Sequence, residues 1–104
     1  EEQAKKFGVR APMVGHLGDG NFHVVLPFDP AKKEMYKQIR AFNDSLIKKA
    51  LELNGTITGE HGVGLHKKEY LLEEHPDNIP VMKSIKRTID PNNIMNPGKI
   101  FDLN

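Results

Sequence analysis

The stretch APMVGHLGDGNFHVVLPF, residues 11–28, decides the fold of this chain. It contains two short apolar segments, rich in β-branched and aromatic residues, on either side of Gly18-Asp19-Gly20-Asn21. An Asp-Gly pair supplies the two positions with positive φ that a two-residue type I′ loop needs. The stretch therefore predicts a β-hairpin with Asp19-Gly20 at its tip.

This loop fixes an expected register for the hairpin. His16 would face His23 directly, and facing residues share one side of a sheet with Cβ atoms about 4.5–5.5 Å apart. The opposite side would carry apolar side chains and face the core. These are Met13, Leu17, Phe22, Val24 and Leu26.

A long amphipathic helix is predicted after the hairpin, because apolar residues recur there at spacings of three and four until Asn54-Gly55. They are Met35, Ile39, Phe42, Leu46, Ala50 and Leu53. A brief strand is expected over residues 55–59, and two further helices over residues 65–72 and 80–89. The order β-β-α-β-α-α predicts the α+β class, with a small antiparallel sheet covered by helices on one side.

Composition narrows the range of functions. The chain has 104 residues, with 15 Lys and Arg against 14 Asp and Glu, so it lacks the cationic excess of a nucleic-acid-binding surface. It has no cysteine, which excludes thiolate zinc sites and thiol nucleophiles. The sequence starts without Met or a signal pattern, so we expect an internal or C-terminal piece of a longer polypeptide.

Three residues form a candidate metal site. Two histidines on one hairpin face, His16 and His23, could share an ion, and Glu60 would complete a His₂Glu set that leaves coordination positions open for a substrate. Each residue also has a simpler interpretation. The histidines could be sheet residues that bond to backbone or water, and Glu60 could be a solvated residue in a strand-to-helix turn.

His61 is a candidate general base beside this site. Imidazole, with an ordinary pKa near 6.5, can accept a proton at neutral pH. Glycines at 59, 62 and 64 surround Glu60-His61 and allow close approach of a ligand to the backbone. In an extended segment the side chains of Glu60 and His61 would point to opposite sides.

Four motifs together carry a resemblance to a known family. They are Gly15 to His23 (GHLGDGNFH), Gly59 to Gly64 (GEHGVG), Asp90-Pro91 and Asn96 to Lys99 (NPGK). In this order, over residues 13–101, the chain resembles the C-terminal domain of FAD-linked oxidases. That family includes D-lactate dehydrogenases, the flavin subunit of glycolate oxidase and D-2-hydroxyglutarate dehydrogenase.

The resemblance implies that residues 1–104 are a C-terminal substrate or cap domain, part of a ferredoxin-like cap, of a flavin-dependent dehydrogenase. Such an enzyme oxidises a D-2-hydroxy acid, here D-lactate or glycolate, to the 2-oxo acid. FAD would be bound mainly by an N-terminal domain absent from this chain. A homo-oligomer, and a location in the cytoplasm or at the periphery of the inner membrane, are compatible with this assignment.

The resemblance also implies roles for individual residues. His16, His23 and Glu60 match ligands of a divalent metal such as zinc. His61 matches the base that takes the substrate hydroxyl proton. Asn96 and Lys99 match a segment that returns toward the flavin.

Two alternatives stay open on the sequence alone. Relatives specialised for dicarboxylates carry Asn two residues after the second histidine, where this chain has Val25. Val25 favours a small monocarboxylate over 2-hydroxyglutarate, but a D-2-hydroxyglutarate-type dehydrogenase remains an alternative substrate assignment. A metal-binding or interaction module without enzymatic activity is an alternative of a different class.

Overall fold

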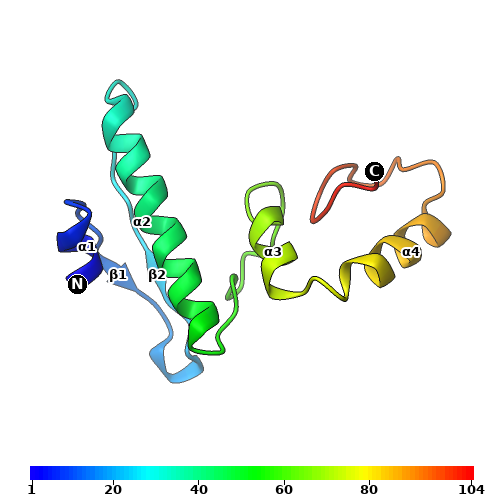
Figure 1. The fold of residues 1–104 in the computed structure, drawn as a ribbon, viewed down its shortest axis with the longest axis horizontal. Coiled ribbons are helices and arrows are strands. Elements are labelled where there is room, and N and C mark those ends of the chain that lie inside the picture. Colours follow the sequence, from blue (N-terminus) through cyan, green and yellow to red (C-terminus); the bar gives the residue numbers. More distant parts are fainter. The chain divides into compact units, whose positions relative to one another are not determined.

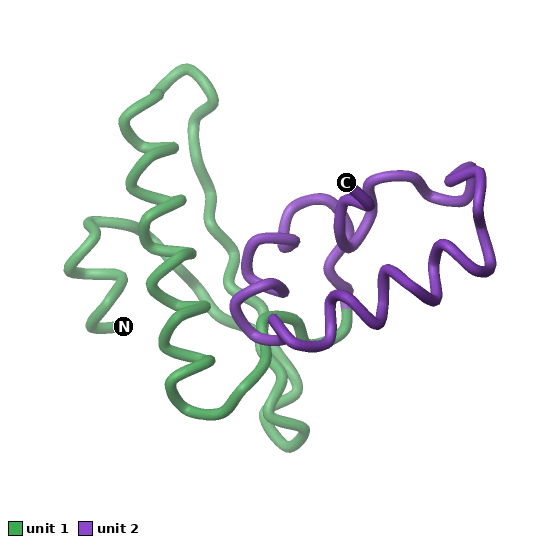
Figure 2. Tube along the Cα trace, turned by 45° about the vertical axis from the view of Figure 1, so that its right-hand side comes forward, with its two compact units in different colours: residues 1–60 green, residues 61–104 purple.

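The computed structural model describes residues 1–104 and contains four α-helices and one two-stranded antiparallel sheet (Figure 1). This content confirms the predicted α+β class. The chain divides into two compact units, Glu1–Glu60 and His61–Asn104, which Figure 2 colours separately. No helix combines the length and the apolarity that a bilayer crossing requires.

The hairpin of the first unit forms with a different register from the one predicted. Strands β1 (Met13–Val14) and β2 (His23–Val24) pair so that Val14 faces His23. The expectation that His16 faces His23 is therefore wrong.

The conformation of the loop explains the shift. A 3₁₀ turn, η1 (Leu17–Asp19), follows His16, whose carbonyl accepts the N–H groups of Asp19 at 2.9 Å and Asn21 at 3.2 Å. Within this loop only Gly20 has a positive φ, +70°, whereas a type I′ turn needs two such residues in succession. The connection is thus longer than the predicted two-residue loop, and His16 lies outside the paired strands.

The expected apolar face of the hairpin does not form a core. Met13, Leu17 and Phe22 are 59%, 84% and 48% exposed. With only two paired residues in each strand, the hairpin offers too little surface to bury a full apolar face.

The core of the first unit lies instead along helix α2 (Lys33–Glu52), the long helix predicted from the sequence. Phe42 and Ile47 are its buried residues. The ring of Phe42 meets the ring of Phe7 edge-on, with centroids 6.1 Å apart. Phe7 follows α1 (Glu2–Lys6), a short helix that was not predicted and that lies beside α2 in Figure 1.

Gly15 sits where the chain passes very close to itself. A Cβ at this position would lie 2.5 Å from both the carbonyl oxygen of Asn21 and the Cα of Phe22. These are backbone atoms, so no side-chain rotation could relieve the contact. Gly15 is therefore required by the closeness of the two hairpin segments.

The strand predicted over residues 55–59 is absent, since the only strands are β1 and β2. Ile57 in this segment is buried, which accounts for its apolar, β-branched character. The chain then bends over residues 59–61. A bend there, rather than a strand, changes how Glu60 and His61 are presented.

The second unit contains helices α3 (Lys68–Glu74) and α4 (Ile79–Ile89). They confirm the two helices predicted in this region, although α3 begins later than expected. Leu71 of α3 and Ile79 of α4 are buried. An apolar pocket of about 500 Å³ opens in this unit, lined by Val63, Leu71, Met82, Ile85, Lys86, Ile89, Asp90, Met95, Ile100 and Phe101.

Asp90 ends α4 and organises the turn that follows it. Its carboxylate accepts the backbone N–H groups of Ile94 at 3.0 Å and Met95 at 2.9 Å, and it pairs with the Lys86 ammonium. The donated hydrogen bond of Lys86 is the main reason that the pKa of Asp90 lies below its ordinary value, and the two backbone donors add to it. Asp90 is the buried charged group of the chain.

The C-terminal tail is tied to the start of this unit. The N–H of Ile100 donates to the carbonyl of Gly64 at 2.8 Å, and Lys68 pairs with Asp102 at 2.8 Å. The tail therefore lies against the segment between His61 and α3.

Candidate functional site

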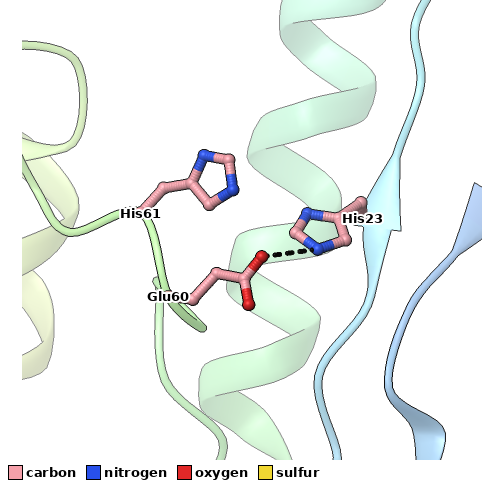
Figure 3. Close-up of side chains that lie close together, drawn as sticks. All are labelled: His23, Glu60 and His61. Carbon is pink, nitrogen blue, oxygen red and sulfur yellow. Dashed lines mark ion pairs between the residues drawn. The ribbon is translucent and has the colours of Figure 1, made fainter.

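The strongest candidate site begins with a pair of side chains in the first unit. His23, the first residue of β2, places its Nε2 atom 2.9 Å from Oε1 of Glu60, in the bend after α2 (Figure 3). The two side chains are 34% and 47% exposed. The pair is thus held together while remaining open to a ligand from solvent.

Asn21 holds the other oxygen of the same carboxylate. Its Nδ2 group donates a hydrogen bond to Oε2 of Glu60 at 3.2 Å. Each oxygen of Glu60 therefore has its own partner, His23 for Oε1 and Asn21 for Oε2.

The absence of a side chain at residue 59 makes room for this arrangement. A Cβ on Gly59 would lie 2.0 Å from Oδ1 and 2.7 Å from Cγ of Asn21. The three atoms nearest to that position all belong to the Asn21 side chain. Any larger residue at 59 would have to displace the Asn21 amide.

His61 lies next to this pair through the chain, since it directly follows Glu60. The ligand atoms of His23, Glu60 and His61 all lie within 4.8 Å of one another, and Figure 3 shows the three side chains. The expectation that Glu60 and His61 diverge is therefore wrong. It assumed an extended segment, whereas the chain bends here.

His16 has a different setting from the other predicted ligand residues. It precedes η1, is exposed, and does not belong to the group formed by His23, Glu60 and His61. Of the three ligands predicted from the sequence, the structure brings together His23 and Glu60.

Asn96 and Lys99, the residues predicted to face the flavin, lie in a turn of the second unit. Asn96 has a φ of +48°, and its carbonyl accepts the N–H of Lys99 at 3.3 Å. Both residues are exposed.

Asn21 is the residue of this site that the sequence analysis missed. Its position could have indicated its role. In an extended segment residues two apart point to the same side, so Asn21 is expected on the same side as His23. In the structure Asn21 and His23 both contact Glu60.

The chemistry of these side chains suits a divalent metal ion. Imidazole nitrogen and carboxylate oxygen are ordinary ligands for zinc and similar ions. A hydrogen bond from a neighbouring group that orients a ligand carboxylate, as Asn21 does for Glu60, is a usual feature of metal sites. The residues present therefore fit such an ion.

Comparison with known proteins gives consistent matches. The sequence model of the family described as FAD linked oxidases, C-terminal domain, matches residues 1–100. The chain is 45% identical to a probable mitochondrial D-lactate dehydrogenase of Danio rerio over 96 residues, which is 91% of this chain and 19% of that protein. It is 41% identical to the glycolate oxidase subunit GlcD of Bacillus subtilis (strain 168) over 99 residues, 94% of this chain and 21% of that protein.

A third relative carries a different name. The chain is 42% identical to a D-2-hydroxyglutarate dehydrogenase of Stutzerimonas stutzeri (strain A1501) over 90 residues, 84% of this chain and 19% of that protein. In all three comparisons the chain spans about a fifth of the length of the relative.

Proposed function

Because this chain belongs to the family of FAD linked oxidases, C-terminal domain, as its motifs indicated, we propose that it is the substrate-binding part of a dehydrogenase for D-2-hydroxy acids. An N-terminal domain of the same polypeptide would bind FAD and complete the active site. The observation that carries the proposal is the contact between His23 and Glu60 with His61 adjacent in the chain. The names of the relatives support the choice of reaction.

The proposed metal site consists of His16, His23 and Glu60. The geometry of the pair supports His23 and Glu60, and the resemblance alone supports His16. A divalent metal bound here would supply a Lewis acid that lowers the pKa of the substrate hydroxyl group. The exposed edges of His23 and Glu60 leave room for the hydroxyl and carboxylate groups of a small substrate.

His61 is proposed to act as the general base. Its imidazole takes the proton from the substrate hydroxyl group as the C2–H bond breaks, so that the product is the 2-oxo acid. FAD, when bound, would supply the acceptor for the hydride from C2. The proximity of His61 to Glu60 supports this role, because the base must reach the same hydroxyl group that the metal site orients.

D-lactate is the proposed substrate, and glycolate is the second choice. Val25 is 51% exposed and lies two residues after His23. An apolar side chain there offers no hydrogen bond to a second carboxylate, which disfavours D-2-hydroxyglutarate. D-2-hydroxyglutarate is the alternative if this side chain does not face the substrate.

The test uses the full polypeptide that contains this chain, loaded with FAD and Zn²⁺, and a dye as electron acceptor. We expect kcat/KM to be highest for D-lactate, lower for glycolate and lowest for D-2-hydroxyglutarate. Reduction of the dye by none of the three acids would contradict the proposed function. Stoichiometric binding of Zn²⁺ without turnover would favour the metal-binding module instead.

A further inference from the structure

The carboxylate of Glu60 has two oxygens with two different partners, and one of these partners is outside the proposed ligand set. Oε1 lies 2.9 Å from Nε2 of His23, and Oε2 accepts a hydrogen bond of 3.2 Å from Nδ2 of Asn21. We infer that Asn21 is a positioning residue, which fixes the Glu60 carboxylate so that Oε1 is directed at His23. This inference rests on the metal site proposed above.

The physical reason is the freedom of a glutamate side chain. Glu60 is about half exposed and sits in a bend, and several single bonds separate its carboxylate from the backbone, so hydrogen bonds to the carboxylate itself decide its orientation. A carboxylate with one oxygen bound to an amide N–H loses the rotation that would exchange its two oxygens. The second oxygen is then already oriented when a metal ion arrives, which reduces the entropic cost of binding.

Asn21 packs closely against the backbone at Gly59. The amide of Asn21 occupies the space where a side chain at residue 59 would be, with Oδ1 only 2.0 Å from the position of a Cβ. The bend that presents Glu60 and the residue that orients it are therefore packed directly against each other. Gly59 makes this packing possible, and its φ lies outside the left-handed region, so alanine is compatible with the backbone at this position.

This geometry gives a double-mutant test. Asn21→Ala removes the donor, and Gly59→Ala displaces it. Both changes should weaken Zn²⁺ binding by about 10- to 100-fold, the usual effect of losing a group that orients a ligand. Since the three atoms nearest to the new Cβ all belong to the Asn21 side chain, the double variant should bind Zn²⁺ no more weakly than either single variant.

The measurement is the dissociation constant of Zn²⁺ for the metal-free full polypeptide, from competition with a chromophoric chelator. Asn92→Ala and Gly18→Ala serve as matched controls. Asn92 is exposed, and a Cβ on Gly18 would meet no atom within 4 Å, so both controls should bind Zn²⁺ like the wild type. Wild-type affinity in Asn21→Ala, or additive losses in the double variant, would overturn the inference.

A second measurement separates this inference from the proposed function. If the wild-type protein does not bind Zn²⁺, the proposed metal site fails, and crystal structures of the metal-free variants still decide the role of Asn21. We expect the distance of 2.9 Å between His23 Nε2 and Glu60 Oε1 to be lost in both Asn21→Ala and Gly59→Ala. Retention of that distance in Asn21→Ala would refute the positioning role.

Discussion

The imidazole of His23 contacts the carboxylate of Glu60 at 2.9 Å, although one comes from the hairpin and the other from the bend after the long helix α2. A contact between such distant segments requires both to be placed by the fold of the first unit. The proposed chemistry therefore requires the fold to bring these two segments together.

The first prediction separates ligands from base in the FAD-loaded full polypeptide. His23→Ala should lose metal and activity together, and excess Zn²⁺ should restore part of the rate. His61→Ala should retain stoichiometric metal while kcat falls by about 10²- to 10⁴-fold, the usual contribution of a positioned proton acceptor. Metal analysis and steady-state kinetics provide the readouts.

His16→Ala completes that comparison. We expect it to lose metal as His23→Ala does, because the proposed set needs a third ligand. If His16→Ala retains the ion and His61→Ala loses it, then His61 is the third ligand. The proposed mechanism would then lack its base.

A second prediction concerns the close approach at Gly15. Gly15→Ala should lower the free energy of unfolding by about 1–3 kcal/mol, as overpacking against rigid groups does, because the new Cβ would meet backbone atoms at 2.5 Å. Gly18→Ala is the matched control, since its Cβ would lie in open space. Denaturant titrations of the two variants should therefore differ, and equal midpoints would contradict the described contact.

A third prediction follows from the lowered pKa of Asp90. Its ionised form is stabilised in the folded state, so its contribution is present at pH values above 3.8, the ordinary value, and is lost as the pH falls through the lower folded-state pKa. Asp90→Asn should reduce Tm at neutral pH. The difference from wild type should shrink as the pH falls below 3.8.

Asp77→Asn is the control for this experiment, because Asp77 is exposed and the substitution removes the same charge from the same unit. Its Tm should stay close to that of the wild type across the pH range. A loss of Tm in Asp90→Asn that is independent of pH would show that the second acceptor oxygen, rather than the charge, matters at residue 90.

A fourth prediction addresses substrate choice. Val25→Asn should raise the ratio of kcat/KM for D-2-hydroxyglutarate to that for D-lactate by about tenfold, which corresponds to one added hydrogen bond. Val81→Asn, at an exposed valine of α4, should leave the ratio unchanged. An unchanged ratio in Val25→Asn would mean that residue 25 does not face the substrate.

The last prediction is that the isolated 104-residue chain does not turn over D-lactate. Its relatives are about five times longer, and the 104 residues contain no complete flavin-binding motif. A dye-reduction assay with added FAD measures this directly. Turnover by the isolated chain would contradict the need for a separate FAD-binding domain.

Helices α2 and α4 could be predicted from the sequence because their apolar residues recur with a strong period, whereas the short helix α1 was not predicted. Phe42, one of the periodic apolar residues that predicted helix α2, is buried in the structure. The hairpin register could not be predicted in the same way. Two-residue strands contribute few pairing hydrogen bonds, and the carbonyl of His16 instead accepts two N–H groups that close a longer loop.

The candidate site was partly predictable for a related reason. Glycine-rich segments around His23 and Glu60 indicated where the backbone comes close to other groups, and the structure brings these two residues together. The bend at residues 59–61 lies beside the buried Ile57 and the close approach of Asn21 to Gly59, two tertiary features that a local pattern does not contain. The contact of Asn21 with Glu60 and the closeness of His61 to the other two residues could therefore not be predicted.

The two close-packed glycines differ in what they touch, and this difference has an evolutionary consequence. Gly15 meets backbone atoms, so no second substitution can compensate for a side chain there, and a mutational scan should find it intolerant in every genetic background. At Gly59 the three atoms nearest to an added Cβ belong to the side chain of Asn21, so the tolerance of residue 59 should depend on residue 21. Alanine at position 59 should be tolerated in sequences that have a small residue at position 21. The effects of substitutions at these two positions would then depend on each other, which is epistasis.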